Sequence, residues 1–298
     1  MPSPFPPSLS RRQFLAAGTA TAGAVLLGAC GGNDGDSAAS TTTTAPGSLA
    51  MAQIFGGPMF IAGRELRAPF GLADQDGLLP LDRTPSLVEV QMLDPKGEAL
   101  GAPVGVARHA EGLPRPYFPL VTTVDAPGIY TARVTLDGVG AEMAIQVHSA
   151  DDVRLIMPGA PMPPLETPTF DDARGVSPIC TNDPVCPLHE VAVAQALAEG
   201  SPTALLVASP AFCQIAICGP VLDVLLDVTD DFPEVRFVHA EVYADPADNT
   251  EATAPAIGPL HLHFEPCLVL VGSDGVVADR LDTIYDRVEA RDRLASLA

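Results

Sequence analysis

The chain has 298 residues, with 37 acidic against 16 basic side chains and a formal net charge of −21 at pH 7. A charge of this sign is repelled by phosphate backbones, which argues against a nucleic-acid partner. The length suits two globular domains of about 100–150 residues each, and beyond the N-terminal region no apolar stretch reaches the roughly 20 residues that span a bilayer.

The N-terminal thirty residues have the pattern of an export signal. Arg11 and Arg12 are adjacent and precede a mild apolar run at residues 14–29, which closes with Leu-Gly-Ala before Cys30. The run is diluted by Gly, Thr and Ala and is too short for a spanning helix. The segment resembles a twin-arginine signal ending in a lipobox, which implies cleavage before Cys30 and attachment of lipid to its thiol.

This resemblance sets the expected location of the protein. Residues 1–29 would be a signal peptide, and residues 30–48 would be the lipidated cysteine and a flexible stalk, because they contain almost nothing that could form a core. The acidic, lysine-poor composition is typical of a high-GC actinobacterium. We expect acyl chains to hold the folded part at the outer face of the cytoplasmic membrane.

Residues 49–150 show short alternating strands separated by turn signals. Residues 87–92 and 129–134 alternate apolar with polar side chains, and Pro-Lys-Gly and Asp-Gly turns follow such runs. Period-two strands joined by these turns predict an antiparallel sandwich. The stretch Asp-Ala-Pro-Gly-Ile-Tyr at residues 125–130 resembles the corner before a late strand of immunoglobulin-like domains. This resemblance implies a fold and no chemistry.

The hydrophobic period changes after a proline-rich stretch at residues 151–177, which we interpret as an interdomain linker. Periodicity predicts strands at residues 203–208, 235–242, 267–271 and 276–281, and helices at residues 191–197, 221–228 and 285–297. Alternating strands and helices followed by a hairpin and a closing helix predict an α/β domain with a mixed sheet over residues 178–298.

The order of these elements is similar to the thioredoxin fold. A buried strand runs into Ser-Pro-Ala-Phe and Cys213, cysteines stand at the head of a helix, and Glu265-Pro266 precedes a hydrophobic strand. The resemblance implies that Pro266 is a cis-proline beside the active-site cysteines and that Cys267 lies close to Cys213. The strings around residues 178–190 and 211–220 are also similar to a group of actinobacterial thioredoxin-like lipoproteins.

Cys213 and Cys218 are the candidate catalytic pair for thiol-disulfide exchange on an extracytoplasmic client protein. A thiol at a helix N-terminus is stabilised as a nucleophilic thiolate. The spacing departs from the Cys-x-x-Cys of the family, and two helical cysteines five positions apart would diverge by about 140°. Cys213 must therefore lie in the loop or cap for the pair to meet, and a fixed disulfide, a redox pair and a metal site all stay open.

The predicted exchange site assigns a role to each of its cysteines and to Pro266. Cys213 would attack and Cys218 would resolve, while Pro266 shapes the substrate groove. Cys267, buried under that groove, could substitute as the resolving thiol. The strand at residues 203–208 lacks the buried carboxylate that serves thioredoxins as a proton acceptor.

Cys180 and Cys186 flank an Asn-Asp-Pro turn, and His189 follows three residues later. A zinc site would need a fourth ligand that this spacing does not supply. A structural disulfide between the two cysteines, closing a small loop, is the favoured interpretation.

Copper binding is the main alternative to redox chemistry. Copper chaperones of cytochrome oxidase assembly also have a thioredoxin fold, with two cysteines at a helix head and a histidine before the late strand. This resemblance implies a Cu(I) site made of Cys213, Cys218 and His263. Otherwise no cofactor is expected, and His263 would lie on an exposed strand or loop. A third possibility is a non-catalytic binding module whose cysteines are structural.

Overall fold

The computed structural model describes residues 49–213, 215–245 and 249–297, and every described residue belongs to the same compact unit. The predicted signal peptide and Cys30 lie outside the described residues. Strand accounts for 35% of the structure and helix for 16%, which confirms that the protein is rich in β-sheet. In the part of the chain that is described, no helix is both long and apolar enough to cross a bilayer.

Residues 50–147 form two four-stranded antiparallel sheets. In one sheet β2 pairs with β1, β3 and β6, and the other has the order β5-β4-β7-β8. The strands are β1 (Ala50–Gln53), β2 (Glu65–Asp74), β3 (Gly77–Leu78), β4 (Leu87–Leu93), β5 (Val104–Ala107), β6 (Phe118–Thr123), β7 (Gly128–Leu136) and β8 (Val139–Val147). The predicted runs at residues 87–92 and 129–134 are thus strands of the same sheet.

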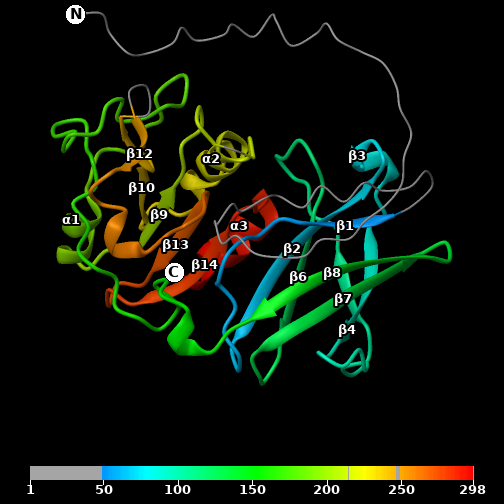
Figure 1. The fold of residues 1–298 in the computed structure, drawn as a ribbon. Coiled ribbons are helices and arrows are strands. Elements are labelled where there is room, and N and C mark those ends of the chain that lie inside the picture. The colour runs from blue at the N-terminus through cyan, green and yellow to red at the C-terminus, as the bar shows by residue number, and fades with distance from the viewer. Residues whose placement is uncertain (1–48, 214, 246–248, 298) are drawn as a thin grey trace, which may run out of the picture. The chain divides into compact units, whose positions relative to one another are not determined.

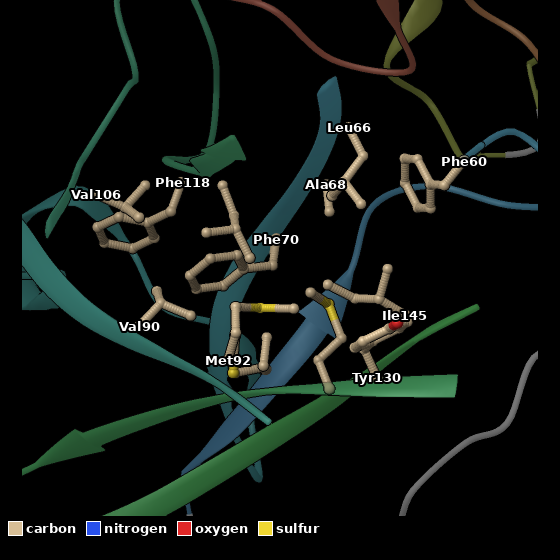
Figure 2. Close-up of a cluster of buried hydrophobic side chains, with 14 of the residues drawn as sticks. Phe60, Leu66, Ala68, Phe70, Val90, Met92, Val106, Phe118, Tyr130 and Ile145 are labelled. Atoms are coloured by element: carbon tan, nitrogen blue, oxygen red, sulfur yellow. The ribbon is translucent and has the colours of Figure 1, made fainter. Parts of the chain in front are cut away.

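The two sheets share one hydrophobic core (Figure 2). Alternate residues of the strands point into it, as period-two sequences require. Phe70 of one sheet stacks on Phe118 with ring centroids 5.3 Å apart, and Val90 and Met92 reach the same cluster from the other sheet. At the corner before β7, the hydroxyl of Tyr130 donates to a carbonyl four residues upstream at 2.8 Å.

The C-terminal half has a four-stranded mixed sheet in the order β10-β9-β13-β14, in which only the β9–β10 pair is parallel. Its strands are β9 (Thr203–Val207), β10 (Arg236–Ala240), β13 (Cys267–Val271) and β14 (Val277–Asp282), and β11 (Tyr243–Asp245) pairs separately with β12 (Asn249–Thr253). The α-helices are α1 (Val193–Ala198), α2 (Cys218–Leu226) and α3 (Arg287–Leu294) (Figure 1). Short 3-10 helices are Leu81–Arg83, Ala150–Asp152, Thr229–Asp231, Gly258–Leu260 and Ala295–Leu297.

The mixed sheet is buried on both faces. Leu206 and Leu268 pack with α2 and α3 on one face, whereas Val207 and Cys267 pack with α1 on the other. Because successive residues of a strand point to opposite faces, neighbours in sequence belong to different hydrophobic clusters. This parity decides which cysteines share a site.

The proline-rich stretch at residues 151–177 has little regular structure, yet it is packed. Met162, Leu165 and Val176 are buried in the cluster on the α1 face of the mixed sheet. Backbone hydrogen bonds join Gly159 to Val277 at 2.8 Å and continue toward the turn before β14. The segment therefore lies along the sheet edge formed by β14.

A buried ion pair joins the first sheet to α3. Arg67 of β2 donates to both carboxylate oxygens of Glu289, each at 2.6 Å, and Tyr117 also donates to this carboxylate. The two charged side chains are only 9% and 7% exposed. Burial alone would lower the pKa of Arg67, but the charge of Glu289 outweighs that effect and raises it.

The start of α3 makes a second connection. The Asp286 carboxylate caps the helix by accepting from the Glu289 N–H at 2.9 Å, and its other oxygen accepts from the backbone N–H groups of Ala110 and Glu111 at 3.0 Å. A capping carboxylate satisfies N–H groups that a helix leaves without partners. Here the same side chain also orders the loop between β5 and β6.

Candidate functional site

Cys213 and Cys218 meet at the start of α2. Cys213 lies in the turn that follows β9, and Cys218 is the first residue of the helix. Between them Ala216 adopts a left-handed conformation with φ of 53°, which turns the chain back toward the helix. Cys213 is partly exposed and Cys218 is fully buried. The structure thus brings the pair together as the spacing required, with Cys213 in the loop.

The two thiols have different protonation preferences. A hydrogen bond with Cys218, supported by backbone N–H groups at the head of α2, lowers the pKa of Cys213 to about 5. The same hydrogen bond, together with burial, raises the pKa of Cys218 above its ordinary value. At neutral pH the exposed sulfur is therefore a thiolate and the buried one its hydrogen-bond donor.

Glu265 supplies a carboxylate to the pair. The Cys218 sulfur lies 3.6 Å from Oε2 of Glu265, and the backbone N–H of Ser209 donates to the same oxygen at 2.7 Å. Burial, reinforced by the charge of Cys213, raises the pKa of Glu265 to about 7. A carboxyl group with this pKa can accept a proton from Cys218 near neutral pH.

Sequence reasoning missed this group because it looked for the carboxylate on the strand before the cysteines. Glu265 lies instead in the loop before β13, directly before Pro266. The Glu265–Pro266 peptide is cis, as the thioredoxin resemblance implies. The one local signal was an acidic residue next to that proline.

Cys267 does not join the exchange pair, which corrects the expectation of three sulfurs in one pocket. It is buried on the α1 face of the sheet, where its sulfur accepts from Arg280 at 3.4 Å. Burial raises its pKa well above the ordinary value. Because Cys218 packs on the opposite face, the sheet separates the two sulfurs and Cys267 is not positioned as a resolving thiol.

His263 is exposed, and its ring lies against Gly57 in the first half of the chain. A Cβ at Gly57 would lie 2.1 Å from its Nε2. Its ring packs edge-on against Phe264 at 5.1 Å. Among the described residues, His263, Cys213 and Cys218 do not form a cluster that could hold a metal ion.

A cavity of about 800 Å³ opens beside the exchange pair. The C-terminal half contributes Ile215, Tyr243 and Phe264 to its walls, and the sandwich contributes Phe55 and Leu78. The lining is mainly apolar, with Glu265 at the cysteine side. The cavity thus connects the cysteine loop with the sandwich.

A second cluster contains Cys180, Cys186, His189 and His239, all of them buried. The Cys180 sulfur lies 3.6 Å from Nδ1 of His239. The Cys186 sulfur lies 3.3 Å from that nitrogen and 3.4 Å from Nε2 of His189. One ligand atom from each residue lies within 4.8 Å of the other three, so the group has the size of a metal site.

The fourth member of this cluster was absent from the sequence interpretation. Cys180, Cys186 and His189 are close in sequence, but His239 comes from β10, which the chain reaches only after α2. No motif spacing within the local sequence predicts such a residue. The buried Cys2His2 group fits a metal ion. Thiolate and imidazole are also ligands of copper, and this is the one respect in which the cluster resembles the predicted copper site.

Cys180 and Cys186 are free thiols in this structure, as are the other described cysteines. A hydrogen bond with Cys186, assisted by the two histidines, lowers the pKa of Cys180 well below its ordinary value. The predicted disulfide between these residues remains a prediction about the isolated protein. The arrangement described here holds both sulfurs against imidazole nitrogens instead.

Thr181 connects the Cys2His2 cluster to the exchange site. Its hydroxyl accepts from the backbone N–H of Ala211 at 3.2 Å, in the turn that carries Cys213. The same hydroxyl donates to Glu241 at 2.9 Å. The residue next to Cys180 therefore supports the turn that presents the exposed sulfur.

The geometry of the two cysteine-containing clusters is the basis for assigning a function to this protein. No family model matches this chain, and no curated protein has significant sequence similarity to it.

Proposed function

We propose that this protein exchanges thiols and disulfides in client proteins outside the cytoplasm, with Cys213 as the nucleophile and Cys218 as the resolving thiol. One observation carries the proposal: a partly exposed Cys213 is paired with a buried Cys218 whose thiol faces Glu265. The arrangement contains a thiolate, a second thiol and a proton acceptor, which are the three groups that exchange requires.

The topology supports a thioredoxin-like fold for residues 178–298. The sheet order β10-β9-β13-β14 has one parallel pair followed by an antiparallel hairpin, with helices on both faces. The cysteine turn follows the central strand β9, and the cis-proline precedes β13. The two packed antiparallel sheets and the Tyr130 hydrogen bond likewise support an immunoglobulin-like sandwich in the first half.

The reaction follows from the two thiols and one carboxylate. The Cys213 thiolate attacks one sulfur of a client disulfide, forming a mixed disulfide and releasing a client thiolate. Cys218 then transfers its proton to Glu265 and attacks Cys213, which releases the second client thiolate. Two electrons pass to the client and the enzyme retains a Cys213–Cys218 disulfide. The same steps in reverse oxidise a client dithiol.

The apolar cavity supports recognition of client chains. Its walls include Ile215 and Ile217 of the cysteine turn and Glu265, the residue directly before Pro266. Phe55 and Leu78 give the sandwich a part in the same surface. We assign the sandwich the role of forming one wall of the client groove.

Replacing Cys218 with Ala is expected to trap client proteins as mixed disulfides through Cys213, because the second attack then lacks its thiol. Cys213→Ala should form no adduct, and Cys267→Ala should behave like the unmodified protein because its sulfur lies on the other sheet face. Non-reducing electrophoresis with a disulfide-bonded substrate, followed by peptide mapping, makes the measurement. A folded Cys218→Ala protein that traps nothing contradicts the proposal. Loss of Cu(I) binding without any effect on exchange would favour the copper alternative.

We also propose membrane attachment through Cys30, on the sequence pattern alone. Cys30→Ala is expected to release the protein into the medium or leave an uncleaved precursor, because the lipid-bearing thiol is removed. Replacing Arg11 and Arg12 together with Lys should block export. Cell fractionation and detergent-phase partitioning provide the measurement. Continued partitioning of the Cys30→Ala protein into detergent contradicts the lipid anchor.

A further inference from the structure

Exchange chemistry leaves the buried cluster of Cys180, Cys186, His189 and His239 without a role. We propose that these four residues bind a single Zn²⁺ ion in a closed tetrahedral site. The proposal does not depend on thiol exchange, because none of the four side chains belongs to the exchange pair. Its basis is the spacing of the donor atoms, their burial and their chemistry.

The donor spacing agrees with a zinc tetrahedron. With Zn–S near 2.3 Å and Zn–N near 2.0–2.1 Å, a sulfur and a nitrogen on the same ion lie about 3.6 Å apart. Three of the four sulfur-to-nitrogen distances in the cluster are 3.3, 3.4 and 3.6 Å. All remaining separations are within 4.8 Å, so none would have to close by more than about 1.5 Å around the ion.

The ring of His239 is oriented for metal binding. Its Nε2 lies 2.9 Å from the carbonyl oxygen of Ala208. Donation of an N–H to this carbonyl places the lone pair on Nδ1, which faces both sulfurs. Metal-binding histidines in proteins are commonly held through the second ring nitrogen in this way. The backbone N–H of His239 also donates to Leu188 at 2.8 Å, which holds the ligand-bearing segment against β10.

A zinc ion satisfies this cluster better than a disulfide does. A Cys180–Cys186 bond would consume both sulfurs and leave the two buried ring nitrogens that face them, Nδ1 of His239 and Nε2 of His189, without a strong partner. Buried polar groups without partners are costly. Nδ1 of His189 already has no hydrogen-bond partner, so its Nε2 contact with Cys186 is the polar contact that this ring makes. One ion would engage a donor atom of all four residues.

Ligand identity and burial indicate a structural ion. Two thiolates and two imidazoles in a tetrahedron suit zinc, and four protein ligands leave no position for water or substrate. Cys180, Cys186 and His189 come from the irregular segment before α1, while His239 comes from the edge strand β10. The ion would therefore fasten that segment to the sheet, directly behind the turn supported by Thr181.

The first test is the metal content and spectrum of the purified full chain. One equivalent of zinc is expected, and replacing it with Co²⁺ should give the ligand-field bands of a tetrahedral site and a sulfur-to-cobalt charge-transfer band. Alkylation should spare Cys180 and Cys186 until a chelator is added. A Cys180–Cys186 disulfide in the purified protein, or binding of Cu(I) without zinc, overturns the proposal.

Variants locate the site. His239→Gln and Cys186→Ser are expected to lose the zinc equivalent, whereas Cys267→Ser and Cys213→Ser should retain it. Titration of the chelator-treated unmodified protein with Co²⁺ gives the stoichiometry even where a variant fails to fold. Loss of the cobalt spectrum in Cys213→Ser but not in His239→Gln would place the ion elsewhere and overturn the assignment. None of these outcomes bears on trapping by Cys218→Ala.

Discussion

Glu265→Gln is expected to slow resolution of the mixed disulfide about 100-fold at neutral pH, because general acid-base groups contribute 10²–10⁴-fold to proton-transfer steps. The amide retains the size of the carboxylate but cannot accept the proton of Cys218. The first attack, by Cys213, needs no proton acceptor because that sulfur is already ionised. Rapid-mixing kinetics with a chromogenic disulfide separates the two steps.

The pH dependence of the two steps gives a second measurement of the same groups. Burial raises the pKa of Glu265, so the carboxylate that accepts the proton is lost as the pH falls through that raised pKa. The mixed disulfide lacks the Cys213 charge that contributes to the value of about 7 in the reduced protein, so resolution should weaken between the ordinary carboxyl pKa and about pH 7. Attack by Cys213 should persist down to about pH 5. Glu265→Gln should remove the pH dependence of resolution and keep that of the attack near pH 5.

Glu241 provides the matched control for this substitution. Its carboxyl group is also buried, but it accepts from the backbone N–H and hydroxyl of Thr181 rather than from a cysteine. Glu241→Gln should leave the ratio of the two steps unchanged. Equal slowing of both steps by Glu265→Gln would mean that Glu265 only supports the fold of the cysteine turn.

Glu289→Ala is expected to lower the free energy of unfolding by about 3–5 kcal/mol, because it leaves the buried Arg67 guanidinium without its carboxylate. Arg67 keeps two backbone carbonyl contacts, to Asp282 and Ile284, and these carry no compensating charge. Tyr117 loses the acceptor of its hydroxyl at the same time. Chemical denaturation of the purified protein, followed by circular dichroism, measures the change.

An exposed ion pair in the same protein is the control for this effect. Arg133 and Glu142 bridge β7 and β8 at 2.6 Å, but their side chains are 46% and 53% exposed. Glu142→Ala should cost about 0–1 kcal/mol, because solvent screens such pairs. The double variant Arg67→Met with Glu289→Leu should recover most of the loss from Glu289→Ala. Similar losses from Glu289→Ala and Glu142→Ala would contradict the assigned importance of burial.

Local patterns in the sequence were sufficient for most of the regular elements. In the C-terminal half, each predicted strand and helix lies within three residues of its observed bounds. The start of α2 differs by three residues, since the helix begins at Cys218 rather than Val221. Gly219 and Pro220 suppressed the helical pattern there, yet proline is tolerated in a first turn whose N–H groups have no intrahelical acceptor.

The sequence by itself also determined that Cys213 and Cys218 could meet only with Cys213 outside the helix, because five helical positions would turn two cysteines apart. The tertiary structure decided which other groups reach that pair. Glu265 approaches Cys218 from the loop before β13. In the second cluster, His239 of β10 approaches Cys186 in the same way. Contacts between residues this far apart in the chain depend on strand order and register, which local periodicity does not encode.

Cys267 shows the same limit most directly. Its position directly after the cis-proline Pro266 predicted a place near the exchange pair. The side-chain direction depends on the parity of one strand position, because a shift of one residue moves a side chain to the other face of the sheet. Only the pairing of Cys267 with Val207, in the register between β13 and β9, put the sulfur beside Arg280 instead of Cys218.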